Sequence, residues 1–316
     1  MKKLLSTSIL LFFNLLLFAQ QDPQFSHYMF NQAFYNPAAV GLDSRSIDAR
    51  ALYRTQWLGY DADFSSGGAP TSQLLTVGLP LAKMNGGIGL SFLNDNLGAV
   101  NNQEIQLSFA YHISFGNSTL SLGARGGLFH YYLDYKKLTF VDDNDVINRE
   151  NGSVSELVPD FAAGIYFDSP SLFLSASMNH LQQSTFSSGD GNIMTLRRHL
   201  TVMGGTNIDL VEGVTIQPSV IMKSDFNAYS FEGSVLAIIN NSFYGGVNMR
   251  EVEALTILAG ANLTKSKNLT LGYAFDLTLQ NKSAKSATSH ELMLSYRFGM
   301  SDKTPPNTVR TPRFRF

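Results

Sequence analysis

Short segments in which apolar and polar residues alternate follow one another from residue 47 to residue 300. In one of them, Leu269, Leu271 and Tyr273 fall on one face, while Thr270 and Gly272 fall on the other. Apolar residues at every second position predict a β-strand with one apolar face. The repeated pattern therefore predicts an all-β chain of about fourteen antiparallel strands.

The predicted strands occupy fourteen ranges. They are residues 47–57, 71–80, 85–94, 102–115, 119–133, 160–168, 171–179, 198–210, 213–222, 227–239, 242–250, 254–264, 268–279 and 288–299. The gaps between them are expected to alternate between short turns and longer loops, the longest being 58–70, 134–159 and 180–197. This alternation is typical of a bacterial outer-membrane barrel, which has short periplasmic turns and longer outer loops.

The N-terminus has the pattern of a secretory signal peptide. Lys2 and Lys3 precede an apolar run that ends at Ala19 and is followed by polar residues. The run is shorter than the roughly 20 residues that a membrane-spanning helix needs, and no other stretch of the sequence approaches that length. We therefore expect residues 1–19 to be removed, and residues 47–300 to enter the outer membrane as a closed barrel, with apolar faces toward lipid.

Charged residues on the polar faces are predicted to point into the lumen, because an Arg or Lys at the bilayer midplane costs about 2–4 kcal/mol. These residues are Arg50, Arg54, Glu104, Arg125, Glu232, Asp276, Glu291 and Arg297. A charge-selective pore favours one sign of charge. The mixed signs favour cross-strand pairs that close the lumen.

Composition excludes several kinds of function. The net charge of -2 offers no electrostatic footprint for nucleic acid. The absence of cysteine excludes disulfides, thiolate metal sites and cysteine nucleophiles. No two of the 6 histidines lie three to five residues apart, and neither a Gly-x-Ser-x-Gly nor a His-Glu-x-x-His motif occurs. We therefore predict no catalytic residue, no metal ligand, no cofactor and no enzymatic activity.

Residues 20–46 precede the first predicted strand and are too apolar for a solvated leader, since they include Phe25, Tyr28 and Phe34. Asn36 and Pro37 predict a turn. We expect this segment to pack inside or under the barrel as a plug, with that turn fixing its reversal.

Residues 301–316 follow the last predicted strand and contain three prolines, which do not fit the interior of a sheet. With an even number of strands, both termini lie in the periplasm, so we expect this short tail beside the N-terminal segment. Candidate docking residues for a periplasmic partner, or for the barrel's own lumen, are Pro312, Arg313, Phe314 and Phe316. A tail without fixed structure is the alternative.

The predicted loop 134–159 contains a group of acidic and amide residues: Asp142, Asp143, Asn144 and Asp145. Clustered oxygen ligands suit a hard cation such as Ca²⁺. The EF-hand pattern is not met because the required glycine is missing. A solvated acidic loop is therefore favoured, and its position on the outer side makes it a candidate for cargo recognition.

Two groups of residues are not explained by barrel physics. The N-terminal group is Asp22, Pro23, Phe25, Ser26, Tyr35, Asn36, Pro37 and Gly41. The first-loop group is Trp57, Gly59, Gly68, Ala69 and Pro70. Together with the segments 87–91 and 290–296, they make nearly all of the mature chain resemble the PorP/SprF family. The sequence departs from the usual family pattern at 61–67, which separates the two halves of the first-loop group and leaves the role of that loop open.

The resemblance implies a protein of the cell outer membrane that is associated with the type IX secretion system and with gliding motility. It implies an anchor or adaptor, with a large secreted surface protein as one partner and periplasmic or outer-membrane secretion components as the other. The lipid bilayer is the remaining partner. The alternative is a channel for small or apolar solutes, similar to fatty-acid transporters, which also have fourteen strands.

Overall fold

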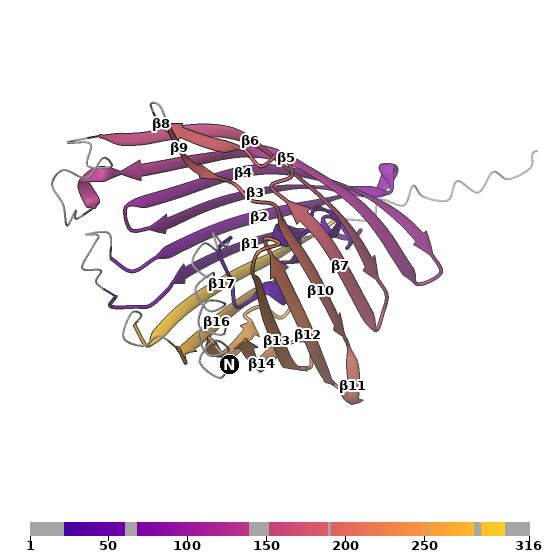
Figure 1. Cartoon of the computed structure of the whole chain (residues 1–316). Helices are drawn as coiled ribbons and strands as arrows, with labels where there is room; N and C mark the ends of the chain where they lie inside the picture. Colours follow the sequence, from indigo (N-terminus) through magenta and orange to yellow (C-terminus); the bar gives the residue numbers. More distant parts are fainter. Residues whose placement is uncertain are drawn as a thin grey trace, which may run out of the picture.

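The fold is almost entirely β-structure (Figure 1). The computed structural model describes residues 22–60, 68–138, 152–188, 191–251, 253–280 and 286–300. Within these residues, no helix is both long and apolar enough to cross a membrane.

Within the described part of the chain, seventeen strands make up most of the regular structure. The first nine are β1 (Ser46–Thr55), β2 (Thr71–Leu81), β3 (Gly86–Leu97), β4 (Val100–Phe115), β5 (Ser118–Asp134), β6 (Ser153–Asp168), β7 (Leu172–Asn179), β8 (Thr185–Ser188) and β9 (Gly191–Thr195). The others are β10 (His199–Thr206), β11 (Ile208–Val211), β12 (Val214–Ser224), β13 (Tyr229–Ile239), β14 (Phe243–Arg250), β15 (Ala254–Asn262), β16 (Leu269–Thr278) and β17 (Thr288–Gly299).

Fifteen of these strands form one antiparallel sheet, and β8 and β9 form a separate hairpin. The sheet closes because β1 pairs with β17 and because β10 pairs with both β7 and β12. Only Asn207 separates β10 from β11, and both continue in one register along β12. The wall therefore has fourteen strands, which confirms the predicted closed barrel.

Three features of the predicted connections were wrong. Strand β6 begins at Ser153, so residues 153–159 belong to the wall instead of an outer loop. The connection between β7 and β10 contains the hairpin of β8 and β9. The strict alternation of gap length also fails, because residues 98–99 alone join β3 to β4. The alternation of apolar and polar residues along the sequence does not show where a strand turns tightly or where a loop contains a hairpin.

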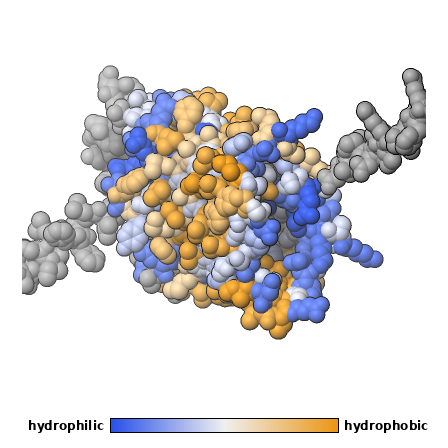
Figure 2. All heavy atoms as spheres, turned by 90° about the vertical axis from the view of Figure 1, so that its right-hand side faces the viewer, coloured by the Kyte–Doolittle hydropathy of each residue, from blue (hydrophilic) through white to orange (hydrophobic). Residues whose placement is uncertain are grey.

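The apolar faces of the strands point outward, as predicted. Leu107 is 55 % exposed and Leu292 is 50 % exposed, although both lie within strands. Figure 2 shows hydrophobic side chains gathered across the middle of one face and hydrophilic ones mainly toward its margins. Exposed apolar residues on every second position are what a lipid-facing wall requires.

The two ends of the barrel differ. Short turns, such as residues 116–117 and 240–242, lie at the end where β1 begins and β17 finishes, and Ser46 pairs there with Gly299. Because short turns and both chain termini lie on the periplasmic side of bacterial barrels, we call this the periplasmic end. The opposite, outer end carries the connections 56–70, 135–152 and 180–198.

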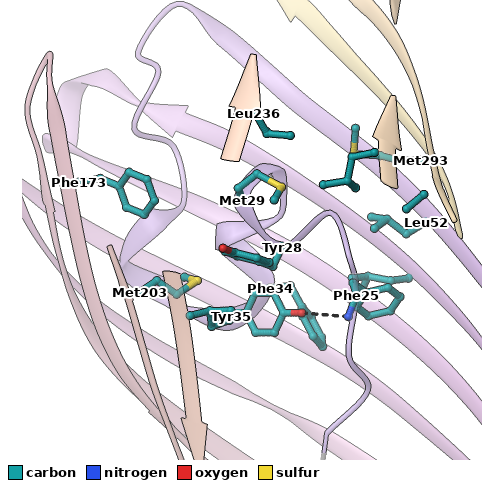
Figure 3. Close-up of a cluster of buried hydrophobic side chains, with 14 of the residues drawn as sticks. Phe25, Tyr28, Met29, Phe34, Tyr35, Leu52, Phe173, Met203, Leu236 and Met293 are labelled. Atoms are coloured by element: carbon teal, nitrogen blue, oxygen red, sulfur yellow. Dashed lines mark hydrogen bonds between the residues drawn. The ribbon is translucent and has the colours of Figure 1, made fainter. Parts of the chain in front are cut away.

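The barrel encloses residues 22–42, which we call the N-terminal segment. It contains three short helical turns, η1 (Tyr28–Phe30), α2 (Gln32–Tyr35) and η2 (Pro37–Ala39). Its buried apolar residues form the core with wall residues (Figure 3), among them Phe25, Tyr28, Met29, Phe34, Tyr35, Leu52, Phe173, Met203, Leu236 and Met293. The lumen face is therefore partly apolar, whereas the sequence pattern predicted a polar one.

The N-terminal segment runs from the outer end of the barrel to the periplasmic end. At its start, Asp22 contacts His180, which follows β7, and His199, which begins β10. At its end, Gly41 packs against Gly87 near the turn between β2 and β3. The start of the segment therefore lies at the outer end, which was not predicted because the sequence contains no signal for the direction of an unpaired segment. The C-terminal tail, which was expected beside the segment, lies outside the described residues.

Candidate functional site

A buried polar network holds the N-terminal segment to three wall strands. The backbone N–H groups of Ser26 and His27 donate to the two carboxylate oxygens of Glu291, at 2.7 and 2.9 Å. Ser26 Oγ donates to Asp276 Oδ1 at 2.9 Å. Arg54 Nη1 donates to Ser26 Oγ at 2.9 Å, and Arg54 Nη2 lies 2.6 Å from Asp276 Oδ2. Because each of these charges is buried and paired, the network fixes the segment in one position.

Asn36 fastens the middle of the segment to β6 and β7. Its Oδ1 accepts the N–H of Ala38 at 2.8 Å, which caps η2, and its Nδ2 donates to Ile165 O and Ser175 Oγ at 2.9 and 2.8 Å. Asn36 is fully buried, so these bonds replace its hydration. The following Pro37 occupies the first position of η2, where its missing N–H costs no hydrogen bond.

Wall glycines allow the close approach of this turn. A Cβ at Gly123 would lie 2.2 Å from Ala38 N, and one at Gly164 would lie 2.1 Å from Asn36 Oδ1. At the end of the segment, Gly41 has a φ of +70°, which a residue with a side chain rarely adopts. The members of the N-terminal group from Tyr35 to Gly41 thus pack the segment against the wall.

Arg125 binds the carbonyl groups at the end of α2. Its Nη1 donates to Phe34 O at 2.7 Å and its Nη2 donates to Ala33 O at 2.5 Å. A cation at the C-terminal end of a helical turn satisfies carbonyl groups that have no partner within the helix. Arg125 therefore contributes to holding the segment, independently of Arg54.

The other predicted lumen charges have different partners, although Asn248 Nδ2 donates both to Glu232 and to Ser26 O and so links Glu232 to that network. Glu232 accepts from Arg250 Nε at 2.8 Å, and Glu104 accepts from Gln106 Nε2 at 2.7 Å. Arg50 lies near the periplasmic end, 3.7 Å from Asp48. Arg297 is exposed there and donates to Lys267 O.

Two cavities lie at opposite ends of the segment. The periplasmic cavity has a volume of about 950 Å³ and is lined by residues that include Asp48, Arg50, Tyr244, Lys267 and Arg297. The outer cavity has a volume of about 780 Å³ and is lined by residues that include Asp22, Trp57, Glu104, Tyr131 and Arg197. The two sets of lining residues have no member in common, because the N-terminal segment lies between the cavities.

The base of the first outer loop brings the two halves of the first-loop group together. Gln56 N donates to Pro70 O at 2.8 Å, across residues 61–67, which lie outside the described residues. Gly59 and Gly68 have φ values of +81° and +68°, so both positions favour glycine. Ala69 lies between Gly68 and Pro70 at the base of the loop. Trp57 N donates to Ser289 Oγ at 3.0 Å.

The hairpin of β8 and β9 folds back onto the inner face of the barrel at the outer end. Phe186 is fully buried, with its ring centroid 5.6 Å from that of Phe129 and 5.2 Å from that of Tyr131. Ser187 N donates to Glu156 Oε2 at 2.7 Å. The hairpin therefore narrows the outer mouth and adds an aromatic side to it.

A cluster of ionisable residues stands beside the outer cavity. Asp22 Oδ1 lies 3.1 Å from His180 Nε2 and 3.4 Å from His199 Nδ1, while His180 Nδ1 lies 3.0 Å from Asp160 Oδ1. Burial by itself lowers the pKa of His180, but Asp22 and Asp160 raise it well above its ordinary value. Burial by itself raises the pKa of Asp22, but His199 and His180 hold it well below its ordinary value. The cluster therefore favours a positive charge between the carboxylates.

Some residues singled out from the sequence lie outside the described residues. These are the signal peptide 1–19, the acidic loop residues Asp142 to Asp145, and the tail residues Pro312, Arg313, Phe314 and Phe316. Other functional candidates were not found from the sequence, chiefly Asp160, His180 and His199. Asp160 and His199 fall on the inward faces of predicted strands. That pattern indicates that both side chains face the lumen, but it does not indicate that they lie close together.

The family comparison decides the identity of the chain. The model of the type IX secretion system membrane protein PorP/SprF matches residues 17–296. The chain belongs to the PorP/SprF family. A PorP/SprF chain with a closed barrel is an outer-membrane protein associated with type IX secretion. No curated protein matches this chain.

Solved structures similar to this PorP/SprF protein are also outer-membrane barrels. The Ralstonia pickettii toluene transporter TbuX is 11 % identical with a TM-score of 0.53, over 85 % of this chain and 93 % of TbuX. The Pseudomonas putida toluene transporter TodX is 10 % identical with a TM-score of 0.51, over 84 % of this chain and 92 % of TodX. At these identities, the likeness shows the fold alone.

Proposed function

We propose that this protein is a non-enzymatic anchor and adaptor. Its outer end binds a large surface protein exported by the type IX system, and its periplasmic end contacts components of the secretion or gliding machinery. Membership of the PorP/SprF family supports the link to secretion.

The observation that carries the proposal is the separation of the two cavities by the N-terminal segment. An adaptor needs two recognition surfaces that act independently, and cavities without a shared lining residue provide them. A solute channel instead needs a passage between the two ends. The buried ion pairs of Arg54 with Asp276 and Glu291 oppose the movement that would open one.

The outer cavity has the chemistry of a protein-binding surface. Trp57, Tyr131 and Leu196 supply apolar area, while Arg197 and Glu253 supply polar groups of opposite charge. Aromatic residues and arginine are enriched where binding energy concentrates in protein interfaces. A volume of about 780 Å³ suits a few residues of a cargo terminus better than a whole folded domain.

Affinity isolation from membranes tests the proposal. Wild-type protein is expected to co-purify with one large surface protein, and Trp57→Ala is expected to release that protein into the medium at normal barrel levels. Tyr53→Ala is the matched control. Tyr53 precedes the first outer loop, on β1, but its side chain faces outward and is 47 % exposed. Retention of the cargo by both variants, together with single-channel currents or solute uptake by the purified protein, would favour the transporter alternative.

A further inference from the structure

Three side chains from separate parts of the chain converge at the outer cavity. Asp22 comes from the N-terminal segment, His180 follows β7, and His199 begins β10. One oxygen or nitrogen atom from each lies within 4.8 Å of those of the other two. His180 and His199 are buried, and Asp22 is partly buried.

The distances suit the ligand shell of a small cation. With metal–ligand bonds of 2.0–2.1 Å, ligand atoms around a tetrahedral zinc ion lie about 3.3 Å from one another. Asp22 Oδ1 lies 3.1 Å from His180 Nε2 and 3.4 Å from His199 Nδ1. A cation bound there would also have to join the two imidazoles, whose ligand atoms lie within 4.8 Å of each other.

A second contact prepares His180 as a ligand. His180 Nδ1 lies 3.0 Å from Asp160 Oδ1, which is buried on β6. Metal-binding histidines usually donate their other ring N–H to a carboxylate, which fixes the tautomer and the ring orientation. The contact with Asp160 leaves Nε2 as the nitrogen directed at Asp22.

We propose that Asp22, His180 and His199 bind a zinc ion, with Asp160 as the positioning residue of His180. Two imidazoles and one carboxylate form a donor set that zinc favours. Asp22 and His199 line the outer cavity, so zinc and a water in the fourth position enter from outside the cell. Glu104 and Lys223 also interact electrostatically with Asp22.

The site would join three elements through metal ligands, in addition to their hydrogen bonds, ion contacts and packing. His180 and His199 stand at the two ends of the connection that carries β8 and β9, and Asp22 stands at the start of the N-terminal segment. Zinc at this position closes that outer connection and fixes the mature N-terminus at the outer mouth. This inference does not depend on the identity of the cargo.

Zinc titration of the purified full-length mature protein in detergent, after treatment with a chelator, tests the site. Calorimetry and metal analysis are expected to give one zinc ion per wild-type chain. His199→Gln and Asp22→Asn are expected to abolish this binding. Asp160→Asn is expected to weaken it by about 10–100-fold, the effect of losing such a positioning carboxylate. His130→Gln is the matched control, because His130 contacts Ser155 and is not one of the three clustered residues.

Limited proteolysis supplies a second measurement. Arg197 and Arg198 precede His199, so zinc is expected to slow tryptic cleavage at these residues in wild type and in His130→Gln, but not in His199→Gln. The heat-modifiable gel mobility of each variant shows whether its barrel is folded. Failure of the wild type to bind zinc, or equal binding by wild type and the conservative Asp22→Asn variant, would overturn the proposal.

Discussion

Arg54 Nη2 lies 2.6 Å from Asp276 Oδ2, and both side chains are buried inside the barrel. The same guanidinium lies 3.3 Å from Glu291 Oε2, so one cation serves two carboxylates on neighbouring strands. Both carboxylates also bind Ser26, which makes the ion cluster the meeting point of wall and N-terminal segment. The position of the segment therefore depends on the charge of Arg54.

Replacing Arg54 by methionine is expected to lower the free energy of unfolding by about 3–5 kcal/mol, because two buried carboxylates lose their cation. Urea unfolding of the protein in lipid or detergent measures this change. Arg297→Met is the control, since Arg297 is exposed at the periplasmic end and its loss should change the stability by no more than about 0.5 kcal/mol. Equal unfolding midpoints for the two variants would contradict a central role for Arg54.

Gly123→Ala is expected to loosen the N-terminal segment, because the new Cβ would lie 2.2 Å from the backbone nitrogen of Ala38. Overpacking of this kind costs about 1–3 kcal/mol. Protease digestion of the folded protein should cut the segment faster in this variant. Gly126→Ala is the matched control on the same strand, since its Cβ would meet only the Phe161 ring at 3.5 Å. Equal cleavage rates would show that the segment is not held by this approach.

The wall could be predicted from the sequence because lipid on one side and lumen on the other impose a period of two on every strand. Leu107 and Leu292 follow that pattern, which can be recognised within one strand without knowledge of the rest of the chain. The cluster of Asp22, His180 and His199 could not be predicted, because barrel closure and the direction of the N-terminal segment bring it together. Arg54 and Glu291 were assigned to the lumen, but their partner Ser26 lies in a segment whose position has no periodic signal.

Removing residues 24–35 is expected to connect the two cavities and open the lumen. The segment contributes Phe25, Tyr28 and Phe34 to the core, so their loss leaves a water-filled path where apolar packing was. Planar bilayer recording should show currents from the deletion variant at protein levels where the wild type is silent. Retention of heat-modifiable mobility distinguishes an open barrel from an unfolded one. Silence of a folded deletion variant would mean that something other than this segment closes the lumen.

Removal of residues 311–316 is expected to weaken co-isolation with periplasmic partners while leaving the surface cargo in place. These residues follow β17, which ends at Gly299 on the periplasmic side, and they lie outside the described residues. Shortening the outer connection at residues 142–152, of which 142–151 lie outside the described residues, should instead release the cargo and keep the periplasmic partners. Quantitative affinity isolation of both truncated proteins, at matched barrel levels, measures the two activities side by side. If both truncated proteins lost the same partners, cargo and machinery would share one binding surface. Truncations at opposite ends of a closed barrel should otherwise remove different partners.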